Sequence, residues 1–468
     1  MNITKNHLQN DTICAIATPA GMGGIAVVRV SGPQAIDIVT KRWQGAPLPD
    51  MASHTAHWGR ITDSQGQILD EVVLTLYRAP HSFTGEDVIE ISCHGSQWIQ
   101  QQLFTTLIDS GCRMAQGGEF TRRAFASGKM DLSQAEAVAD LIAASSRASH
   151  RVALGQMRGQ FSGRLRQLRE QLLRFVSLIE LELDFSEEDV TFADRSQVIQ
   201  LAQEISGVIS SLTQSFSVGN AIKNGVPVAI VGATNAGKST LLNALLHDDR
   251  AIVSDIHGTT RDVIEDTIVM GGVLFRLIDT AGIRQSDDAI EAMGIERSYK
   301  KMREASLVLW VIDATAPLHD TEVFGRQLVE QCHDKQLVAV INKTDLATPS
   351  AQSLEAIKAM LPPEGQVIAI SAQNDNNIQR LQQLLAEVAA MPQMDSDAVV
   401  VTNVRHYEAL CRAQRAIDRA IAALQDGISG DLVSQDIREC LHHLGTITGE
   451  ITTHDILGEI FAHFCVGK

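Results

Sequence analysis

VPVAIVGATNAGKST, residues 226–240, decides the fold of the central part of this chain. Its first six residues form an apolar run that predicts a buried strand. The pattern G-x-x-x-x-G-K-[ST] follows at once, at Gly232, Gly237, Lys238 and Ser239. In this pattern the glycines let backbone N–H groups face phosphate oxygens, Lys238 reaches the β- and γ-phosphates, and the Ser239 hydroxyl binds Mg²⁺. An ordinary Gly-rich turn is a weaker interpretation, because the pattern directly follows an apolar strand.

The sequence around this stretch alternates between short apolar runs and helical segments. The apolar runs are VPVAIV, TIVM, LFRLI, LVLWVI, LVAVI and VIAIS. Such alternation predicts a mostly parallel sheet with helices on both faces. Ligands of these sheets bind beyond the carboxyl ends of the strands. We therefore expect a nucleotide-binding domain over residues 225–391.

Three further motifs follow strands of this predicted sheet and point to guanine. NKTD, residues 342–345, follows LVAVI, and Asp345 can accept hydrogen bonds from N1–H and the 2-amino group of guanine. Adenine has neither donor there, and leaving a buried carboxylate unpaired costs several kcal/mol. SAQ at Ser371–Gln373 would offer a backbone N–H to guanine O6, and DTAG at Asp279–Gly282 would sense Mg²⁺ and the γ-phosphate. The motifs favour GTP and disfavour an ATP-dependent kinase.

The loop AIVSDIHGTTRD places Thr259 and Thr260 where a switch loop supplies a threonine to Mg²⁺. A capped turn is the weaker interpretation, because the phosphate-binding pattern precedes this loop. We expect Ser239 and Thr260 to be the Mg²⁺ ligands. Hydrolysis also needs an oriented water, and the residue after DTAG is Ile283, which cannot orient one. The acidic run that follows offers four carboxylates, and the residues alone do not choose among them. These are Asp287, Asp288, Glu291 and Glu296.

The flanking sequence has a different character on each side. Residues 1–120 mix strand-like runs such as IAVVRV and DVIEISC with helical spacing, which predicts an α+β module. Residues 121–224 and 392–468 repeat apolar residues every three or four positions, which predicts helices. The expected fold class is α/β and α. A P-loop GTPase domain is inserted in an all-helical domain formed from two segments, and an α+β N-terminal domain precedes it.

The composition limits the partners and the compartment. The net charge is −17, so a nucleic-acid role requires a local basic patch or a partner that carries the contact. Seven cysteines without a C-x-x-C pair predict neither a disulfide framework nor a zinc site and are typical of a reducing cytosol. The sequence has no apolar signal core and no run long enough for a membrane helix. We expect a cytoplasmic protein that does not insert in a membrane.

Several longer stretches resemble the MnmE (TrmE) family of tRNA-modification GTPases. They include SDIHGTTRD, DTAGIR, IEAMGIER, GEFTRRAFASGKMDLSQAEAVADLI and the terminal FCVGK, and the resemblance runs nearly end to end. It implies a homodimer joined through the N-terminal domain, with GTP domains that meet when GTP and K⁺ are bound. K⁺ then replaces an arginine finger. The implied K⁺ ligands are Asn235, Ser254, the Ile256 backbone and Thr259, and the implied water-orienting residue is Glu291.

Together, the motifs and the resemblance define the expected GTP site. The predicted GTP-binding residues are Asn235, Ala236, Gly237, Lys238, Ser239, Thr240, Ser254, Asp255, Ile256, His257, Gly258, Thr259, Thr260, Asp279, Thr280, Ala281, Gly282, Asn342, Lys343, Asp345, Ser371 and Ala372. The sequence departs from the family pattern at Thr234, Met22 and Ser254. Ser254 keeps the hydroxyl of the usual threonine, so we expect K⁺ binding to persist.

The resemblance also implies the chemistry that GTP hydrolysis serves. The N-terminal domain would bind 5-formyltetrahydrofolate as a one-carbon source, through Arg29, Glu90, Lys129 and Lys468. Cys465 lies in the family tail and is either near the chemistry or a small buried hydrophobe. With the flavoprotein MnmG (GidA), in a heterotetramer or larger complex, such proteins install a carboxymethylaminomethyl or aminomethyl group at C5 of the wobble uridine of certain tRNAs. The alternatives are a regulatory or ribosome-assembly GTPase and a one-carbon transferase with an inserted GTPase.

Overall fold

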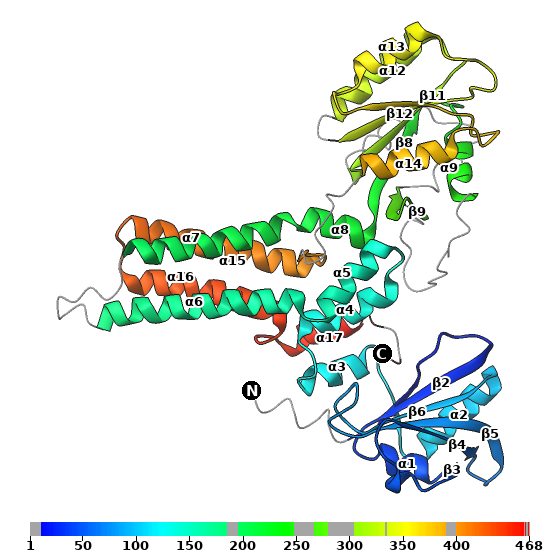
Figure 1. The fold of residues 1–468 in the computed structure, drawn as a ribbon, viewed down its shortest axis with the longest axis vertical. Coiled ribbons are helices and arrows are strands. Elements are labelled where there is room, and N and C mark those ends of the chain that lie inside the picture. The colour runs from blue at the N-terminus through cyan, green and yellow to red at the C-terminus, as the bar shows by residue number, and fades with distance from the viewer. Residues whose placement is uncertain are drawn as a thin grey trace. The chain divides into compact units, whose positions relative to one another are not determined.

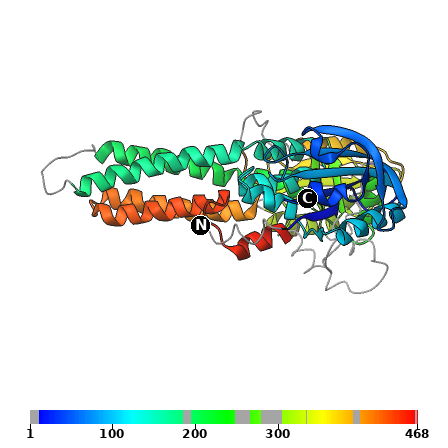
Figure 2. The same ribbon diagram turned by 90° about the horizontal axis from the view of Figure 1, so that it is seen from below.

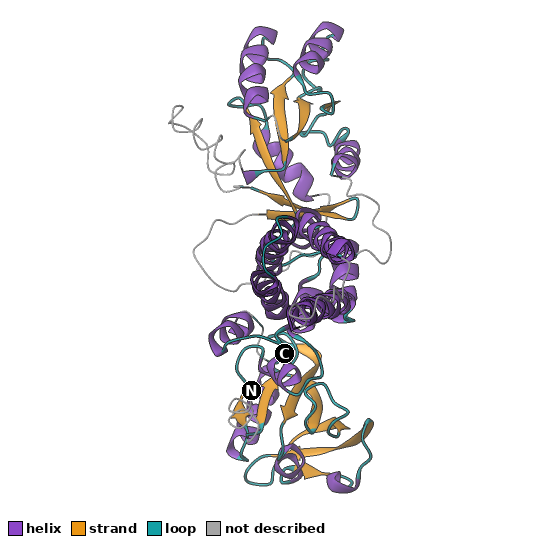
Figure 3. Ribbon diagram, turned by 90° about the vertical axis from the view of Figure 1, so that its left-hand side faces the viewer, coloured by secondary structure: helices purple, strands orange, loops and turns teal. Residues whose placement is uncertain are grey.

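Two β-sheets organise the chain, and each belongs to a different compact unit of the computed structural model (Figure 1). The structure describes residues 11–184, 195–247, 266–278, 304–332, 335–389, 399–462, 464 and 467. One unit comprises Met1–Ala139, Gln156–Asp194 and Ala422–Lys468, and the other comprises Asp140–Gly155 and Arg195–Ile421. Figure 3 separates the strands of both sheets from the helices by colour.

The N-terminal sheet has seven strands in the order β3-β4-β5-β6-β2-β1-β7. Its strands are β1 Ile13–Ile16, β2 Gly23–Ser31, β3 Trp43–Gln44, β4 Thr55–Thr62, β5 Ile68–Tyr77, β6 Val88–Gly95 and β7 Arg113–Met114. Only the β1–β7 pair is parallel among these described strands. Alternate residues of β5, including Val72, Leu74 and Leu76, are buried, as expected for a sheet with one covered face. They share a core with residues of α1 Ala35–Thr40 and α2 Gln97–Asp109.

The same unit contains helices from both ends of the chain. These are α3 Glu119–Ala126, α4 Leu132–Ala143, α6 Gln160–Asp184, α16 Gly430–Thr448 and α17 His454–Ala462. Helix α6 packs against α16, although the nucleotide-binding segment lies between them in the sequence (Figures 1 and 2). Helix α6 has buried residues at helical spacing, such as Leu165, Leu168 and Leu172, as expected for an amphipathic helix. The expected insertion of the GTPase segment between two helical segments is confirmed.

Besides the helices that cover its sheet, the described part of the second unit contains, wholly or mainly, α5 Arg147–Met157, α7 Arg195–Gln214, α8 Phe216–Asn224 and α15 Val404–Gln425. Ser206 on α7 donates a hydrogen bond to Asp418 on α15 at 3.0 Å. This bond joins a helix that precedes the inserted sheet in the sequence to one that follows it. The Phe216 and Tyr407 rings stack with their centroids 4.4 Å apart. Among the described residues, no helix is long and apolar enough to span a membrane.

The second sheet has six strands in the order β13-β12-β11-β8-β10-β9. They are β8 Val226–Gly232, β9 Asp266–Met270, β10 Val273–Leu277, β11 Leu307–Asp313, β12 Gln336–Asn342 and β13 Gln366–Ala369. All neighbours are parallel except β9 and β10. Helices α9 Lys238–His247 and α14 Ile378–Val388 pack on one face, and α12 Leu318–Gln331 and α13 Ala351–Met360 on the other. The predicted mostly parallel sheet, covered on both faces, is confirmed.

Candidate functional site

The phosphate-binding loop joins the end of β8 to the start of α9, at the carboxyl edge of the sheet. Gly237 has a φ of 90°, and a Cβ placed there would lie 2.3 Å from the Nδ2 atom of Asn342. A side chain at this position would therefore strain the backbone and collide with a neighbouring loop. Asn235 has a φ of 62°, in the left-handed region that Asn tolerates better than most residues. This compact turn precedes a helix N-terminus, where anions bind favourably.

Lys238 provides the positive charge of this loop. Its Nζ atom donates to the Gly232 carbonyl oxygen at 3.0 Å and to the Ala233 carbonyl oxygen at 2.7 Å. Burial lowers the pKa of Lys238 below its ordinary value. Ser239 and Thr240 follow in the first turn of α9, with Ser239 exposed. The loop thus combines backbone donors, an ammonium group and a hydroxyl, which suits a polyphosphate with its Mg²⁺.

Asn342 links the phosphate-binding loop to the loop that follows β13. Its Nδ2 atom donates to the Ala236 carbonyl oxygen at 3.1 Å, and its Oδ1 atom accepts from the Ala372 backbone N–H at 3.0 Å. The side chain is buried, with 2% relative exposure. Both polar ends of the amide are therefore satisfied inside the protein. The first residue of NKTD holds two other motifs in register.

Asp345 lies beside Ser371, whose hydroxyl donates to its Oδ1 atom at 2.6 Å. Thr344 donates through its Oγ1 atom to the Ile370 carbonyl oxygen at 2.8 Å, which ties the two loops a second time. The backbones of Ser371 and Asn376 exchange hydrogen bonds of 3.1 and 3.0 Å. A short, charge-assisted hydrogen bond orients one carboxylate oxygen. Asp345 can then present acceptor sites to the paired N–H groups of guanine.

Asp313 is a site residue that the sequence motifs did not reveal. It ends β11, and its Oδ2 atom forms an ion pair with Lys343 Nζ at 2.7 Å. Thr315 adds donors from its backbone N–H at 2.8 Å and its hydroxyl at 2.7 Å. Burial alone would raise the pKa of Asp313, but the hydrogen bonds from Lys343 and Thr315 outweigh it and hold the pKa below its usual value. Lys343, whose φ is 65°, is therefore anchored at its charged end.

The structure brings together Asn235, Ala236, Gly237, Lys238, Ser239, Thr240, Asn342, Lys343, Asp345, Ser371 and Ala372 at the carboxyl ends of the parallel strands β8, β12 and β13. The remaining predicted residues of the nucleotide and K⁺ sites lie outside the described residues. They are Ser254, Asp255, Ile256, His257, Gly258, Thr259, Thr260, Asp279, Thr280, Ala281, Gly282 and the water-orienting Glu291. The other acidic candidates, Asp287, Asp288 and Glu296, lie outside them as well.

A second constellation lies on the N-terminal sheet. Arg29 on β2 and Glu90 on β6 are cross-strand partners, and Arg29 Nη2 lies 2.8 Å from Glu90 Oε1. Arg29 also donates to the Gly467 carbonyl oxygen at 3.3 Å, so the C-terminal segment reaches this pair. Burial, followed by the charge of Glu90, raises the pKa of nearby Tyr77, which the sequence motifs did not single out. Two of the predicted folate residues are thus adjacent.

Of the other two predicted folate residues, Lys129 is described and contacts the loop between β5 and β6, whereas Lys468 is not described. Lys129 donates from Nζ to the Pro80 carbonyl oxygen at 2.8 Å, in the loop between β5 and β6. Lys468 and Cys465 lie outside the described residues, although Gly467 is described. Met22, one of the departures from the family pattern, has 87% relative exposure. An arginine, a lysine and a carboxylate near one loop suit a ligand with carboxylate groups and hydrogen-bond donors.

Comparisons with known proteins agree over nearly the whole chain. A family model described as the MnmE helical domain matches residues 132–465, and one described as the GTP-binding protein TrmE N-terminus matches residues 12–129. A protein named tRNA modification GTPase MnmE from Parabacteroides distasonis is 56% identical over 463 residues, covering 98% of this chain and 100% of its own. Proteins of the same name from Bacteroides thetaiotaomicron and Cytophaga hutchinsonii are 54% and 49% identical. Their alignments cover 98% and 100% of this chain and 100% of each relative.

Proposed function

This chain belongs to the MnmE family of tRNA modification GTPases, and from that premise we propose that K⁺ stimulates its GTP hydrolysis. The chain is a GTP hydrolase that takes part in tRNA modification. In our proposal it acts with a flavoprotein of the MnmG (GidA) type on C5 of the wobble uridine, in the cytoplasm, where its tRNA substrates are. The bonds of Asn342 to the phosphate-binding loop and to the loop after β13 are the observation that carries the nucleotide assignment.

Asp345 would recognise the guanine base. The hydroxyl of Ser371 uses one acceptor position of the Asp345 carboxylate and leaves the others for guanine N1–H and the 2-amino group. Asp345 is exposed in the structure, but a bound base would cover it, and a base without these donors would then leave the carboxylate unpaired, which is costly. The SAQ loop, Ser371–Gln373, would offer a backbone N–H to guanine O6. This arrangement supports GTP over ATP.

Ser239 and Thr260 would hold Mg²⁺ together with phosphate oxygens. Asn235, Ser254, the Ile256 backbone and Thr259 would hold K⁺, and all of them offer the oxygen ligands that hard cations prefer. Asn235 has a left-handed backbone conformation and an exposed side chain, which supports a role in binding a cation at the surface of the loop. Glu291 would orient the attacking water. A bound cation can supply the transition-state stabilisation that an arginine finger gives elsewhere, about 10³–10⁵ in rate.

The N-terminal sheet would bind 5-formyltetrahydrofolate, which supplies a one-carbon unit when bound. Arg29, Glu90, Lys129 and Lys468 are the residues we assign to it. The adjacent charges of Arg29 and Glu90, and the arrival of Gly467 at Arg29, support one shared site. We further propose that two copies of the chain associate through their N-terminal domains, and that the dimer assembles with the flavoprotein into a heterotetramer or larger complex. The chain's net charge of −17 fits a partner that carries much of the tRNA contact.

GTP hydrolysis measured in KCl and in NaCl at matched ionic strength tests the cation mechanism. We expect much faster hydrolysis in KCl, and we expect Glu291→Ala to lose that stimulation while its GTP affinity stays near that of the wild type. Asp320→Asn, an exposed carboxylate change on α12, serves as the control. Equal rates in both salts would remove the K⁺ site and leave a guanine-nucleotide switch as the better interpretation.

A further inference from the structure

The loop between β5 and β6, residues 78–87, borders the Arg29–Glu90 pair, and we call it the strap. Phe83 projects from it, and the Arg29 guanidinium carbon lies 5.8 Å from the centre of its ring. The same carbon lies 5.6 Å from the ring of Phe120. Phe120 is fully buried, whereas Phe83 keeps 38% relative exposure. Phe83 therefore packs near the arginine while part of its ring remains available to another molecule.

Polar and steric contacts fix the strap directly beside Phe83. Thr84 is fully buried; its hydroxyl lies 2.8 Å from that of Ser31, and its carbonyl oxygen accepts from the Ser127 hydroxyl at 2.7 Å. Gly85 has a φ of 81°, and a Cβ there would lie 2.8 Å from Ser127 Oγ. The strap is thus seated so closely on Ser127 that only glycine fits. Phe83 projects from a segment with little freedom to shift.

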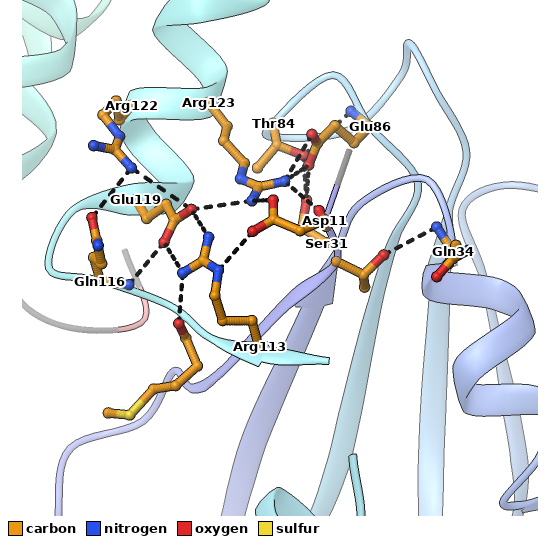
Figure 4. Close-up of polar contacts among 12 residues, drawn as sticks. Asp11, Ser31, Gln34, Thr84, Glu86, Arg113, Gln116, Glu119, Arg122 and Arg123 are labelled. Carbon is orange, nitrogen blue, oxygen red and sulfur yellow. Dashed lines mark hydrogen bonds and ion pairs between the residues drawn. The ribbon is translucent and has the colours of Figure 1, made fainter. Parts of the chain in front are cut away.

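Glu86 connects the strap to a network of buried charges (Figure 4). Its carboxylate accepts from the Ser31 hydroxyl at 2.7 Å and from Arg123 Nη1 at 3.1 Å. The Arg123 side chain is only 3% exposed, and it also contacts Asp11 at 2.7 Å and fully buried Glu119 at 3.1 Å. An arginine held by three carboxylates cannot rotate without breaking several charge-assisted bonds. Glu86 is therefore fixed from the interior of the domain.

The Arg29–Glu90 pair can recognise polar edges of a ligand, and the planar Arg29 guanidinium, which could stack on a ring, already lies against Phe83 and Phe120. We propose that Phe83 supplies that surface and stacks on the pterin ring system of a tetrahydrofolate. We further propose that Glu86, held by Arg123, is a positioning residue that sets where Phe83 stands. The inference rests on the proposed folate site and adds two residues to it.

Calorimetric titration of the full-length protein with 5-formyltetrahydrofolate tests both roles. The variants are Phe83→Leu, Phe83→Tyr, Glu86→Gln and the double variant Phe83→Leu/Glu86→Gln. Phe83→Leu keeps an apolar side chain and loses the ring, whereas Phe83→Tyr keeps the ring. Arg122→Gln is the matched control, because Arg122 contacts Glu119 in the same network, 3.7 Å away, on the side remote from the strap. Thermal unfolding of each variant separates lost binding from lost structure.

We expect Phe83→Leu to weaken binding about tenfold, the upper range for an aromatic pair, and Phe83→Tyr to restore it. Glu86→Gln should weaken binding by about threefold, and Arg122→Gln should bind like the wild type. Because Glu86 acts through Phe83, adding Glu86→Gln to Phe83→Leu should cost little more. Wild-type affinity in Phe83→Leu would overturn the stacking role, and fully additive losses would overturn the positioning role. A wild-type protein that does not bind 5-formyltetrahydrofolate would instead remove the folate site itself.

Discussion

Asn342 makes hydrogen bonds to two separate loops, so its substitution should affect both nucleotide binding and stability. We predict that Asn342→Ala lowers the free energy of unfolding by about 1–3 kcal/mol, since it leaves the buried Ala236 carbonyl and Ala372 N–H groups unpaired. GDP affinity should fall with it, because the phosphate-binding loop loses its tie. Asn342→Asp keeps the acceptor for Ala372 and should bind GDP better than Asn342→Ala. Nucleotide titration and urea unfolding measure both quantities, and an unchanged GDP affinity in Asn342→Ala would contradict the coupling.

Asp313 anchors Lys343, the second residue of NKTD. We predict that Asp313→Asn weakens GTP and GDP binding about three- to tenfold, because a half-buried ammonium loses its charged partner and the lysine is no longer held in place. Asp320→Asn makes the same chemical change at an exposed position of the following helix and should have no effect. Fluorescent-nucleotide binding measures the difference. Equal affinities in the two variants would show that the ion pair does not position Lys343.

Sequence motifs singled out most of the candidate nucleotide residues because each motif directly follows an apolar strand; the structure brings the described ones together, and their contact with a nucleotide stays a prediction. Asp313 was not predicted, because a single aspartate at the end of a strand matches no sequence motif. Its partner, Lys343, is 30 residues away along the chain. The two hydrogen bonds of Asn342 also depend on loops that only the folded sheet brings together. The roles of Glu291, Ser254 and Thr260 stay predictions.

At the scale of elements, the charged network that holds α3 should make the N-terminal unit sensitive to acid. Burial alone would raise the pKa of Glu119, but hydrogen bonds from Arg113, Gln116 and Arg123 hold it below its usual value. The pKa of Asp11 is lowered in the same way, against burial, by Arg113 and Arg123. Because these pKa values are lower in the folded than in the unfolded chain, the stabilisation is complete above the ordinary values of 4.5 and 3.8. It is lost as the pH falls below them, through the folded-state values.

Glu119→Gln tests this network without changing the shape of the side chain. It should lower the free energy of unfolding at pH 7 by about 1–3 kcal/mol, since it removes one of the three carboxylates that hold the buried Arg123. The loss of stability between pH 5 and pH 3 should also be smaller than in the wild type. Urea unfolding followed by tryptophan fluorescence reports mainly on this unit, because Trp43, Trp58 and Trp98 lie in it and only Trp310 lies in the other. A wild-type pH profile in Glu119→Gln would place the acid sensitivity elsewhere.

The elements themselves were predictable to different degrees. Runs such as LVLWVI and LVAVI predicted β11 and β12, because strands buried on both faces are continuously apolar. The short strand β7 and the seating of the strap on α3 were not predicted, since both depend on partners distant in the sequence. Helical periodicity predicted α6 and α16 but not their mutual contact. The domain boundaries near residues 120, 224 and 391 stay predictions.

At the scale of the whole molecule, each face of the second sheet has a core built mainly from residues between α8 and α14. We predict that a fragment of residues 216–389 folds alone and binds GDP, because its sheet, covering helices and NKTD loop are all contained in it. Its affinity should lie within about tenfold of the full-length protein. Circular dichroism and nucleotide titration check this, with the Asn342→Ala fragment as a weak-binding control. A fragment that stays unfolded would show that residues outside this range complete the core.

The close approach of Gly237 to Asn342 also bears on how such a sequence can evolve. A Cβ at position 237 would lie 2.3 Å from the Asn342 amide nitrogen, and the φ of 90° strains any residue with a side chain there even if residue 342 were smaller. A smaller residue at 342, however, loses both hydrogen bonds that join the nucleotide loops. A larger residue at 237 and a smaller one at 342 are therefore both unfavourable, together as well as singly. In an alignment of relatives, two such positions would stay constant and show no covariation, although their side chain and backbone are in direct contact.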